Sequence, residues 1–202
     1  MHTSLHRLAG FISAVFALNT WAGSVQLTVT DPAGKPIPDA VVFLDSAQAR
    51  TAVKPQAGVE VEQVSKQFAP RVTVLPVGSS LAFPNRDTVR HHVYSFSPAK
   101  TFDLKLYAGT PANPVLFDKT GIVVLGCNIH DQMLAWVVVV DTPYFGKTNA
   151  AGQISLPAAP AGNYALKVWH PGLPTGAQPQ EQALVVTQAG QSATFVLKGA
   201  AL

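Results

Sequence analysis

The sequence is poor in cysteine, in charge and in long hydrophobic runs, and each scarcity excludes a class of protein. Charged residues make up only 12% of the 202 residues, and the 14 Lys and Arg are scattered among 11 Asp and Glu, so nucleic acid is not an expected partner. Beyond the N-terminal region, no apolar run approaches the roughly 20 residues of a membrane-spanning helix. No long stretch with a helical period follows either, which argues against a helical protein.

The N-terminus has the pattern of a secretory signal peptide. A basic segment ending at Arg7 precedes an apolar run from Leu8 to Leu18, and Thr20-Trp21-Ala22 offers a small-residue cleavage point. A buried helix or a membrane anchor is the alternative, but about 11 apolar residues are too few to cross a hydrocarbon core of about 30 Å. We therefore predict that residues 1–22 are a cleavable signal peptide and that the mature protein is periplasmic.

Cysteine is nearly absent, because Cys127 is the single cysteine of the chain. In an exported protein, where thiols are normally paired, a lone cysteine has three explanations: an intermolecular disulfide, an inert buried thiol or a metal-bound thiolate. The residues around it decide between them.

Short runs rich in Val, Thr, Phe and Leu alternate with the 16 prolines and 15 glycines, which predicts an all-β fold. Many short strands at regular spacing favour β-sandwiches. The segment Thr51–Gln67 alternates weakly and is compatible with a linker or a short helix. The predicted strands are Ser24–Thr30, Ala40–Asp45, Arg71–Pro76, Ser80–Pro84, His92–Phe96, Thr101–Leu106, Gly121–Leu125, Leu134–Asp141, Gln153–Leu156, Asn163–Trp169, Gln182–Thr187 and Ser192–Leu197.

The two ends of the mature chain carry strand and turn patterns of one kind. Val25–Leu44 resembles the opening half of carboxypeptidase-regulatory-like (transthyretin-type) sandwich domains, and Thr148–Trp169 resembles their closing half. In that family the halves are nearly adjacent, so the resemblance implies an insertion. We predict an accessory β-sandwich from residues 23–49 plus 143–202, and a second domain from residues 50–142. A single merged sandwich is the alternative.

Three soft or borderline metal donors stand within seven residues. Cys127, His130 and Met133 offer a thiolate, an imidazole and a thioether. These donors together favour copper, and blue-copper electron-transfer sites combine two histidines and one cysteine with a long axial methionine. Zinc is the rival metal, but a thioether is a poor zinc ligand and no glutamate lies near the loop to act as a base. One histidine must come from elsewhere in the chain.

An upstream motif supplies that histidine. The order Phe83-x-Asn85-x-Asp87-x-x-x-His91-x-Val93 resembles the first-ligand motif of plastocyanin-like cupredoxins, and the spacing Cys-x-x-His-x-x-Met resembles the ligand loop of amicyanin. The resemblance covers residues 68–141 and identifies the inserted domain as a cupredoxin Greek-key β-sandwich. His91 and His92 point to opposite faces of an extended segment, so only one reaches the metal. The resemblance selects His91, with His92 as the alternative.

The resemblance implies a site for one type 1 copper ion held by His91, Cys127, His130 and Met133. It also implies that single electrons leave through the edge of His130, within an apolar patch that includes Ile129 and Leu134. The chain is further similar to periplasmic proteins grouped with methylamine utilisation, so a periplasmic dehydrogenase or cytochrome is the expected partner.

Two other function classes stay open. The same ligands suit a periplasmic copper-binding or trafficking protein that has no electron-transfer role, and a vestigial copper site would leave a binding module. No Ser-His-Asp triad or pair of carboxylates is visible, so we do not expect an enzyme. His170 is expected to be a residue at the end of a strand rather than a second metal site. Trp136 and Trp169 are expected to pack in the core or at an interface.

Overall fold

The structure is a computed structural model that describes residues 23–202. The predicted signal peptide, residues 1–22, lies outside the described residues. Within the described part of the chain, no helix is long and apolar enough to cross a membrane.

The all-β prediction is confirmed. The described residues form seventeen strands and one short helix, α1 (Ala47–Thr51), whose N-cap Ser46 accepts a hydrogen bond from the Ala49 N–H (3.0 Å). All twelve strands predicted from the sequence are present, with ends that differ by a few residues. The segment Thr51–Gln67 is mixed: Thr51 ends α1, residues 53–57 link it onward without helix or strand, and the second half contains the short strands β3 (Val59–Glu60) and β4 (Glu62–Val64).

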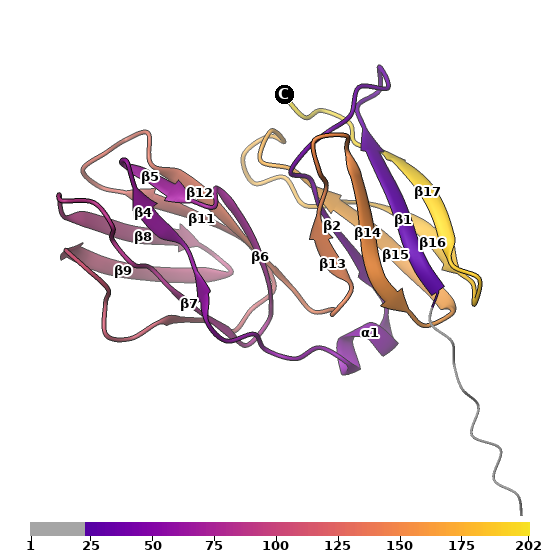
Figure 1. The fold of residues 1–202 in the computed structure, drawn as a ribbon, viewed down its shortest axis with the longest axis horizontal. Coiled ribbons are helices and arrows are strands. Elements are labelled where there is room, and N and C mark those ends of the chain that lie inside the picture. Colours follow the sequence, from indigo (N-terminus) through magenta and orange to yellow (C-terminus); the bar gives the residue numbers. More distant parts are fainter. Residues whose placement is uncertain (1–22) are drawn as a thin grey trace, which may run out of the picture.

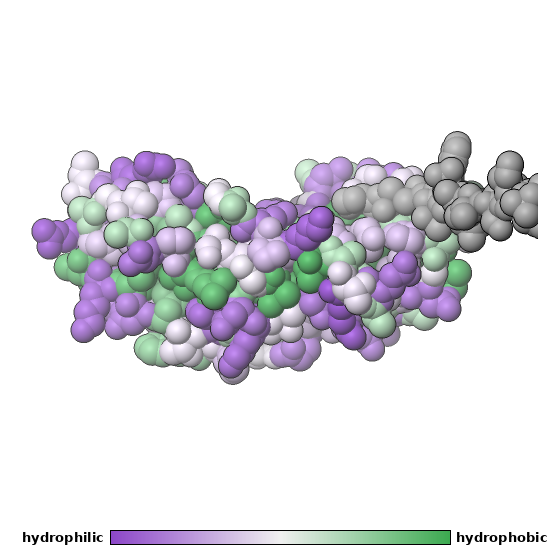
Figure 2. All heavy atoms as spheres, turned by 90° about the horizontal axis from the view of Figure 1, so that it is seen from below, coloured by the Kyte–Doolittle hydropathy of each residue, from purple (hydrophilic) through white to green (hydrophobic). Residues whose placement is uncertain are grey.

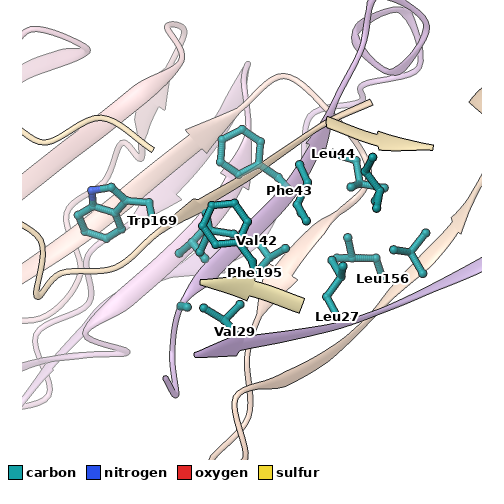
Figure 3. Close-up of a cluster of buried hydrophobic side chains, with 14 of the residues drawn as sticks. Leu27, Val29, Val42, Phe43, Leu44, Leu156, Trp169 and Phe195 are labelled. Carbon is teal, nitrogen blue, oxygen red and sulfur yellow. The ribbon is translucent and has the colours of Figure 1, made fainter. Parts of the chain in front are cut away.

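One sandwich is built from both ends of the described chain. Its first sheet has the order β14 (Gln153–Ala159), β1 (Gly23–Thr30), β17 (Gln191–Val196), in which β1 runs antiparallel to β14 and parallel to β17. Its second sheet has the order β13 (Phe145–Lys147), β2 (Val41–Asp45), β15 (Gly162–Trp169), β16 (Gln180–Val186). The space between the sheets is filled by buried side chains that include Leu27, Val29, Val42, Leu44, Leu156 and Phe195 (Figure 3).

The middle of the chain forms a second group of sheets. A five-stranded sheet has the order β6 (Val72–Pro76), β12 (Leu134–Val140), β11 (Gly121–Cys127), β8 (His91–Ser97), β9 (Lys100–Tyr107). A smaller sheet of β10 (Val115–Phe117), β7 (Ser79–Ala82) and β3 packs against it, and β4 pairs with β5 (Gln67–Ala69) in a hairpin. A separate cluster of buried side chains, among them Leu81, Phe83, Val93, Leu125 and Val137, lies between these sheets.

Side chains of β12 alternate between two buried environments. Ala135, Val137 and Val139 belong to the core of the middle sheets, whereas Val138 and Val140 belong to the core of the sandwich formed by the two ends. The outer face of the five-stranded sheet therefore packs on the other sandwich, which explains why β12 reads as a nearly continuous apolar run.

The two groups of sheets lie side by side in an elongated molecule, with α1 at the connection between them (Figure 1). The predicted boundary between residues 49 and 50 falls inside α1. Trp136 and Trp169 meet across the junction with ring centroids 6.4 Å apart, and the Arg71 guanidinium lies 4.9 Å from the Trp136 ring centroid.

Apolar residues are also exposed in a strip along the central part of the face shown in Figure 2.

Candidate metal centre

Two neighbouring strands carry two buried residues of the candidate site, His91 and Cys127. His91 is the first residue of β8 and Cys127 is the last residue of β11, and the register pairs Cys127 with Val93. Because residues alternate along a strand, His91 and Val93 share one face, and this face points into the core. His91 is 0% exposed and Cys127 is 4% exposed.

His92 points the other way. It is half-buried at the outer face of β8, where its Nε2 contacts the Asp103 carboxylate on β9 and its ring packs edge-on against Tyr94. The structure therefore brings His91, and not His92, to the side of Cys127, as the alternation of the strand requires.

The loop between β11 and β12 brings His130 back to Cys127. Its backbone closes through a hydrogen bond from the Met133 N–H to the His130 carbonyl oxygen (2.9 Å), and β12 begins at the next residue. The pairing of Gly126 with Leu134 holds the two ends of the loop together. A short loop held at both ends loses little further entropy when it wraps an ion.

Three donor atoms converge as a result. The Cys127 Sγ lies 3.8 Å from the His91 Nδ1 and 3.8 Å from the His130 Nδ1, and the donor atoms of all three residues lie within 4.8 Å of one another. The two imidazole rings are tilted by 56° with centroids 4.9 Å apart. Among residues 23–202, this is the one group of three or more His, Cys, Asp or Glu side chains with such a spacing.

These separations fit a single metal ion. With bond lengths of about 2.1 Å to nitrogen and about 2.3 Å to sulfur, as at a protein-bound zinc ion, an angle of about 120° separates the sulfur and nitrogen donors by about 3.8 Å. Both S–N separations in the structure equal this value. A thiolate with two imidazoles is the trigonal donor set of blue-copper sites.

Met133 is buried beside this group. Its side chain is 1% exposed and belongs to the same buried cluster as Cys127 and Val93. A buried, apolar environment suits the weakly polar thioether of methionine. The role of Met133 as the fourth, axial ligand stays a prediction.

Sequence reasoning missed the role of Asp87, although this residue stands in the motif that selected His91. The Asp87 Oδ2 lies 2.8 Å from the His91 Nε2, on the side of the ring opposite Cys127. Burial opposes ionisation of Asp87, but hydrogen bonds from Lys66, His91 and Ser65 outweigh it and hold the pKa of Asp87 below its ordinary value. A carboxylate four residues before the predicted ligand histidine is the sequence signal that could have identified it.

Tyr107 also went unnoticed, and it is the residue paired with His91 in the β8–β9 register. Its hydroxyl donates a hydrogen bond to the Phe83 carbonyl oxygen (2.7 Å). The pKa of Tyr107 is raised to about 12, mainly by burial. A hydrogen bond with Gln63 opposes this rise, and the nearby Cys127 adds to it. The phenol therefore stays protonated and keeps its hydrogen bond to the Phe83 carbonyl oxygen.

The outer edge of the site is apolar and exposed. His130 is half-buried, and Ile129, its neighbour in the loop, is 50% exposed. Leu134, which is 40% exposed, instead lines a pocket together with Trp136 and Trp169. One edge of the metal centre thus approaches the surface, whereas the His91 edge is closed by Asp87.

His170 takes no part in the metal centre. It directly follows β15, where its Nδ1 accepts a hydrogen bond from the Gly172 N–H (3.0 Å). Burial lowers the pKa of His170, so the neutral ring is favoured.

Comparisons by sequence find no match, either among protein-family models or among curated proteins. Solved structures similar to part of the chain include a purple cupredoxin from Nitrosopumilus maritimus, which is 18% identical, with a match over 41% of this chain and 99% of that one and a TM-score of 0.36. A mutant of amicyanin in its Cu(I) form is 18% identical over 49% of this chain and 98% of that one, with a TM-score of 0.38.

A copper-containing nitrite reductase from Thermus scotoductus SA-01 is also similar, at 20% identity over 56% of this chain and 28% of that one, with a TM-score of 0.39. At these identities and TM-scores the likenesses carry no argument about function, and the proposal below rests on the geometry of the site. The resemblance of the chain ends to carboxypeptidase-regulatory-like domains stays a prediction.

Proposed function

We propose that the chain binds one type 1 copper ion through His91, Cys127, His130 and Met133 and carries single electrons between redox partners in the periplasm. One observation carries the proposal: the Cys127 Sγ has an imidazole Nδ1 at 3.8 Å on each of two sides, in a largely buried setting. Thiolate and thioether sulfur together with imidazole nitrogen favour copper over other divalent ions. Bound copper would supply a one-electron couple between Cu(I) and Cu(II).

The chain's own contribution is a rigid set of ligands. His91 and Cys127 belong to paired strands, so backbone hydrogen bonds hold both residues whatever the charge at the site. His130 and Met133 are held by the short closure of their loop. Ligands that move little between two charge states keep the reorganisation that accompanies each electron small. Protein dipoles that are already oriented keep the reorganisation at other charged sites small for the same reason.

His130 is the proposed exit for the electron. His130 is half-buried, and the neighbouring Ile129, which is 50% exposed, provides an apolar contact surface beside it. A small apolar patch suits a weak and transient encounter with a dehydrogenase or a cytochrome. The proposal assigns the chain no substrate-transforming step, no nucleic acid and no membrane span after cleavage of the signal peptide.

The domain organisation is part of the proposal. We assign residues 1–22 to a signal peptide, residues 50–142 to the cupredoxin domain, and residues 23–49 plus 143–202 to the accessory sandwich. The strand pairing supports this division, because β1 and β2 pair only with strands that follow β12 in the chain.

Copper titration with absorption spectroscopy tests the proposal. We expect one copper per chain and an intense thiolate-to-copper charge-transfer band in the visible spectrum, because the donor set is that of a blue-copper site. Cys127→Ser should abolish the band, whereas His92→Asn should keep it because His92 faces away from Cys127. Binding of zinc in preference to copper, or a band that survives Cys127→Ser, would contradict the assignment.

A second measurement separates electron transfer from copper trafficking. An electron carrier should be reduced and reoxidised by a soluble mediator many times while it retains its metal in the presence of a chelator. A trafficking protein should instead release copper to the chelator without a reversible one-electron cycle.

A further inference from the structure

The turn of the β4–β5 hairpin has an unusual backbone. The hairpin is closed by the two residues Ser65 and Lys66, which have φ values of 53° and 56° although neither is glycine. A two-residue hairpin turn of this type requires positive φ at both positions, which usually selects Asn, Asp or Gly. Such a conformation persists in other residues only when the surroundings hold it.

The Asp87 carboxylate holds this turn. Its two oxygens accept hydrogen bonds from the Ser65 N–H (2.7 Å) and from the Lys66 N–H (2.9 Å). Both turn residues are exposed, whereas the Asp87 side chain is only 15% exposed. The carboxylate thus satisfies the two backbone donors that the turn would otherwise leave to water.

The same carboxylate orients the first histidine of the candidate metal centre. The Asp87 Oδ2, which accepts the Lys66 N–H, also lies 2.8 Å from the His91 Nε2. An ionised carboxylate is an acceptor only, so the proton of the neutral ring belongs on Nε2. The lone pair of the His91 Nδ1 is then free on the side of the Cys127 sulfur.

Asn85 keeps Asp87 in place. The Asn85 Oδ1 accepts a hydrogen bond from the Asp87 N–H (2.9 Å), and its Nδ2 donates to the carbonyl oxygens of Val89 (2.8 Å) and Tyr107 (3.1 Å). These contacts connect Asp87 to the segment that leads into β8 and to the end of β9. The position of the carboxylate is therefore set by the fold and not by the metal.

We propose that Asp87 is a positioning residue that couples the Ser65–Lys66 turn to His91, so that the hairpin forms an outer support of the metal centre. Asp87 selects the tautomer and the ring orientation in which the His91 Nδ1 faces Cys127. The inference rests on the proposed function for the identity of the ion, but the hydrogen-bonded chain from turn to histidine exists without metal.

The chain offers a matched control for the test. His92 and Asp103 form a second histidine–carboxylate pair one residue further along β8, but the carboxylate of this pair is exposed and the pair faces away from Cys127. Asp87→Asn and Asp103→Asn therefore remove the same charge from the same kind of pair. Only the first variant should affect His91.

Metal-free protein gives the first readout. Long-range ¹H–¹⁵N spectra at about pH 8, above the ordinary pKa of histidine, should show His91 as the Nε2–H tautomer in the wild-type protein and in Asp103→Asn. We expect a mixture of tautomers in Asp87→Asn. In Asp87→Ala, which removes both acceptors, the amides of Ser65 and Lys66 should exchange with solvent at least about tenfold faster, because they lose their partners.

Copper binding gives the second readout. We expect Asp87→Asn to lower the copper affinity about 10- to 100-fold, the usual effect of removing an outer partner of a ligand histidine. Asp87→Glu should restore part of the loss, and Asp103→Asn should leave the affinity unchanged. Wild-type protein that binds no copper would overturn the proposed function while the tautomer measurement still tests Asp87. An unchanged His91 tautomer in folded Asp87→Asn would overturn the role of Asp87.

Discussion

The buried hydroxyl groups of Thr148 and Thr73 differ in their hydrogen bonding. Thr148 is 4% exposed, and its Oγ1 donates to the Ile37 carbonyl oxygen (2.7 Å) and accepts from the Ala40 N–H (2.9 Å). Thr73 is 6% exposed, but its Oγ1 has no hydrogen-bond partner among residues 23–202. A satisfied buried hydroxyl stabilises the fold, whereas an unsatisfied one costs free energy.

Replacement of each threonine by valine, which has nearly the same shape, should therefore give opposite results. We expect Thr148→Val to lower the free energy of unfolding by about 1–3 kcal/mol, because the Ala40 N–H is left buried without its partner. Thr73→Val should be neutral or stabilising. Denaturant unfolding of both variants measures the difference, and equal losses in the two would contradict the hydrogen bonding described for Thr148.

At the scale of single elements, two glycine turns differ in why they need glycine: one for its backbone conformation alone, the other also because neighbouring atoms leave no room for a Cβ. Gly34 and Gly152 have φ values of 82° and 69°, so any other residue is strained at both positions. A Cβ on Gly34 would meet nothing within 4 Å. A Cβ on Gly152 would lie 2.6 Å from the Val29 carbonyl oxygen and 3.1 Å from the Ile37 nitrogen, which are backbone atoms that cannot rotate away.

We therefore expect Gly34→Ala to lower the free energy of unfolding by only about 1–2 kcal/mol, the cost of a left-handed conformation with a Cβ. Gly152→Ala should cost this amount and about 1–3 kcal/mol more, because β1 must shift to relieve the clash. Chemical denaturation of the two variants side by side provides the measurement. A smaller loss for Gly152→Ala than for Gly34→Ala would mean that the turn before β14 does not lie against β1.

At the scale of the whole molecule, a group of charged residues ties together the two passages of the chain between the sandwiches. Asp45 ends β2, where the chain leaves the first sandwich, and Asp141 follows β12, where it returns. Arg50 in α1 bonds to both, at 2.8 Å from the Asp45 Oδ2 and 3.0 Å from the Asp141 Oδ2. The Lys167 Nζ lies 2.7 Å from the same Asp45 oxygen.

The pH dependence of this group follows from the pKa of Asp45. Burial opposes ionisation, but the hydrogen bonds and charges of Lys167 and Arg50 outweigh it and hold the pKa of Asp45 below its ordinary value of 3.8. A carboxyl group with a depressed pKa contributes stability above its ordinary pKa, and this contribution is lost as the pH falls through the lower, folded-state pKa.

Asp45→Asn should accordingly lower the free energy of unfolding by about 1–3 kcal/mol at neutral pH, because two cations lose their buried partner. The gap to the wild-type protein should narrow as the pH falls below about 4. Asp39→Asn is the control: Asp39 is exposed and paired with Lys147 at 3.5 Å, so the expected change is below about 1 kcal/mol. Unfolding curves at several pH values test this, and a gap that widens in acid would contradict it.

Much of the fold and part of the site could be predicted because the relevant patterns are local. Short runs rich in apolar and β-branched residues, whether alternating or continuous, predict a strand whatever its partner is, and all twelve strands predicted this way are present. The spacing from Cys127 through His130 to Met133 lies within one loop, so the kind of metal that these donors favour can be inferred before the fold is known. The very short strands β3, β4, β5, β10 and β13 carry too few residues for such a pattern.

The amino-acid sequence by itself determined the all-β class, the long strands and the kinds of donor atom available at the candidate metal centre. Only the tertiary structure decided that His91, 36 residues before Cys127, turns its Nδ1 toward that sulfur while His92 turns away. It likewise decided that Asp87 joins His91 to a turn 21 residues earlier. The physical reason is that these contacts depend on strand register and on hydrogen bonds between distant segments, which no local pattern of residues encodes.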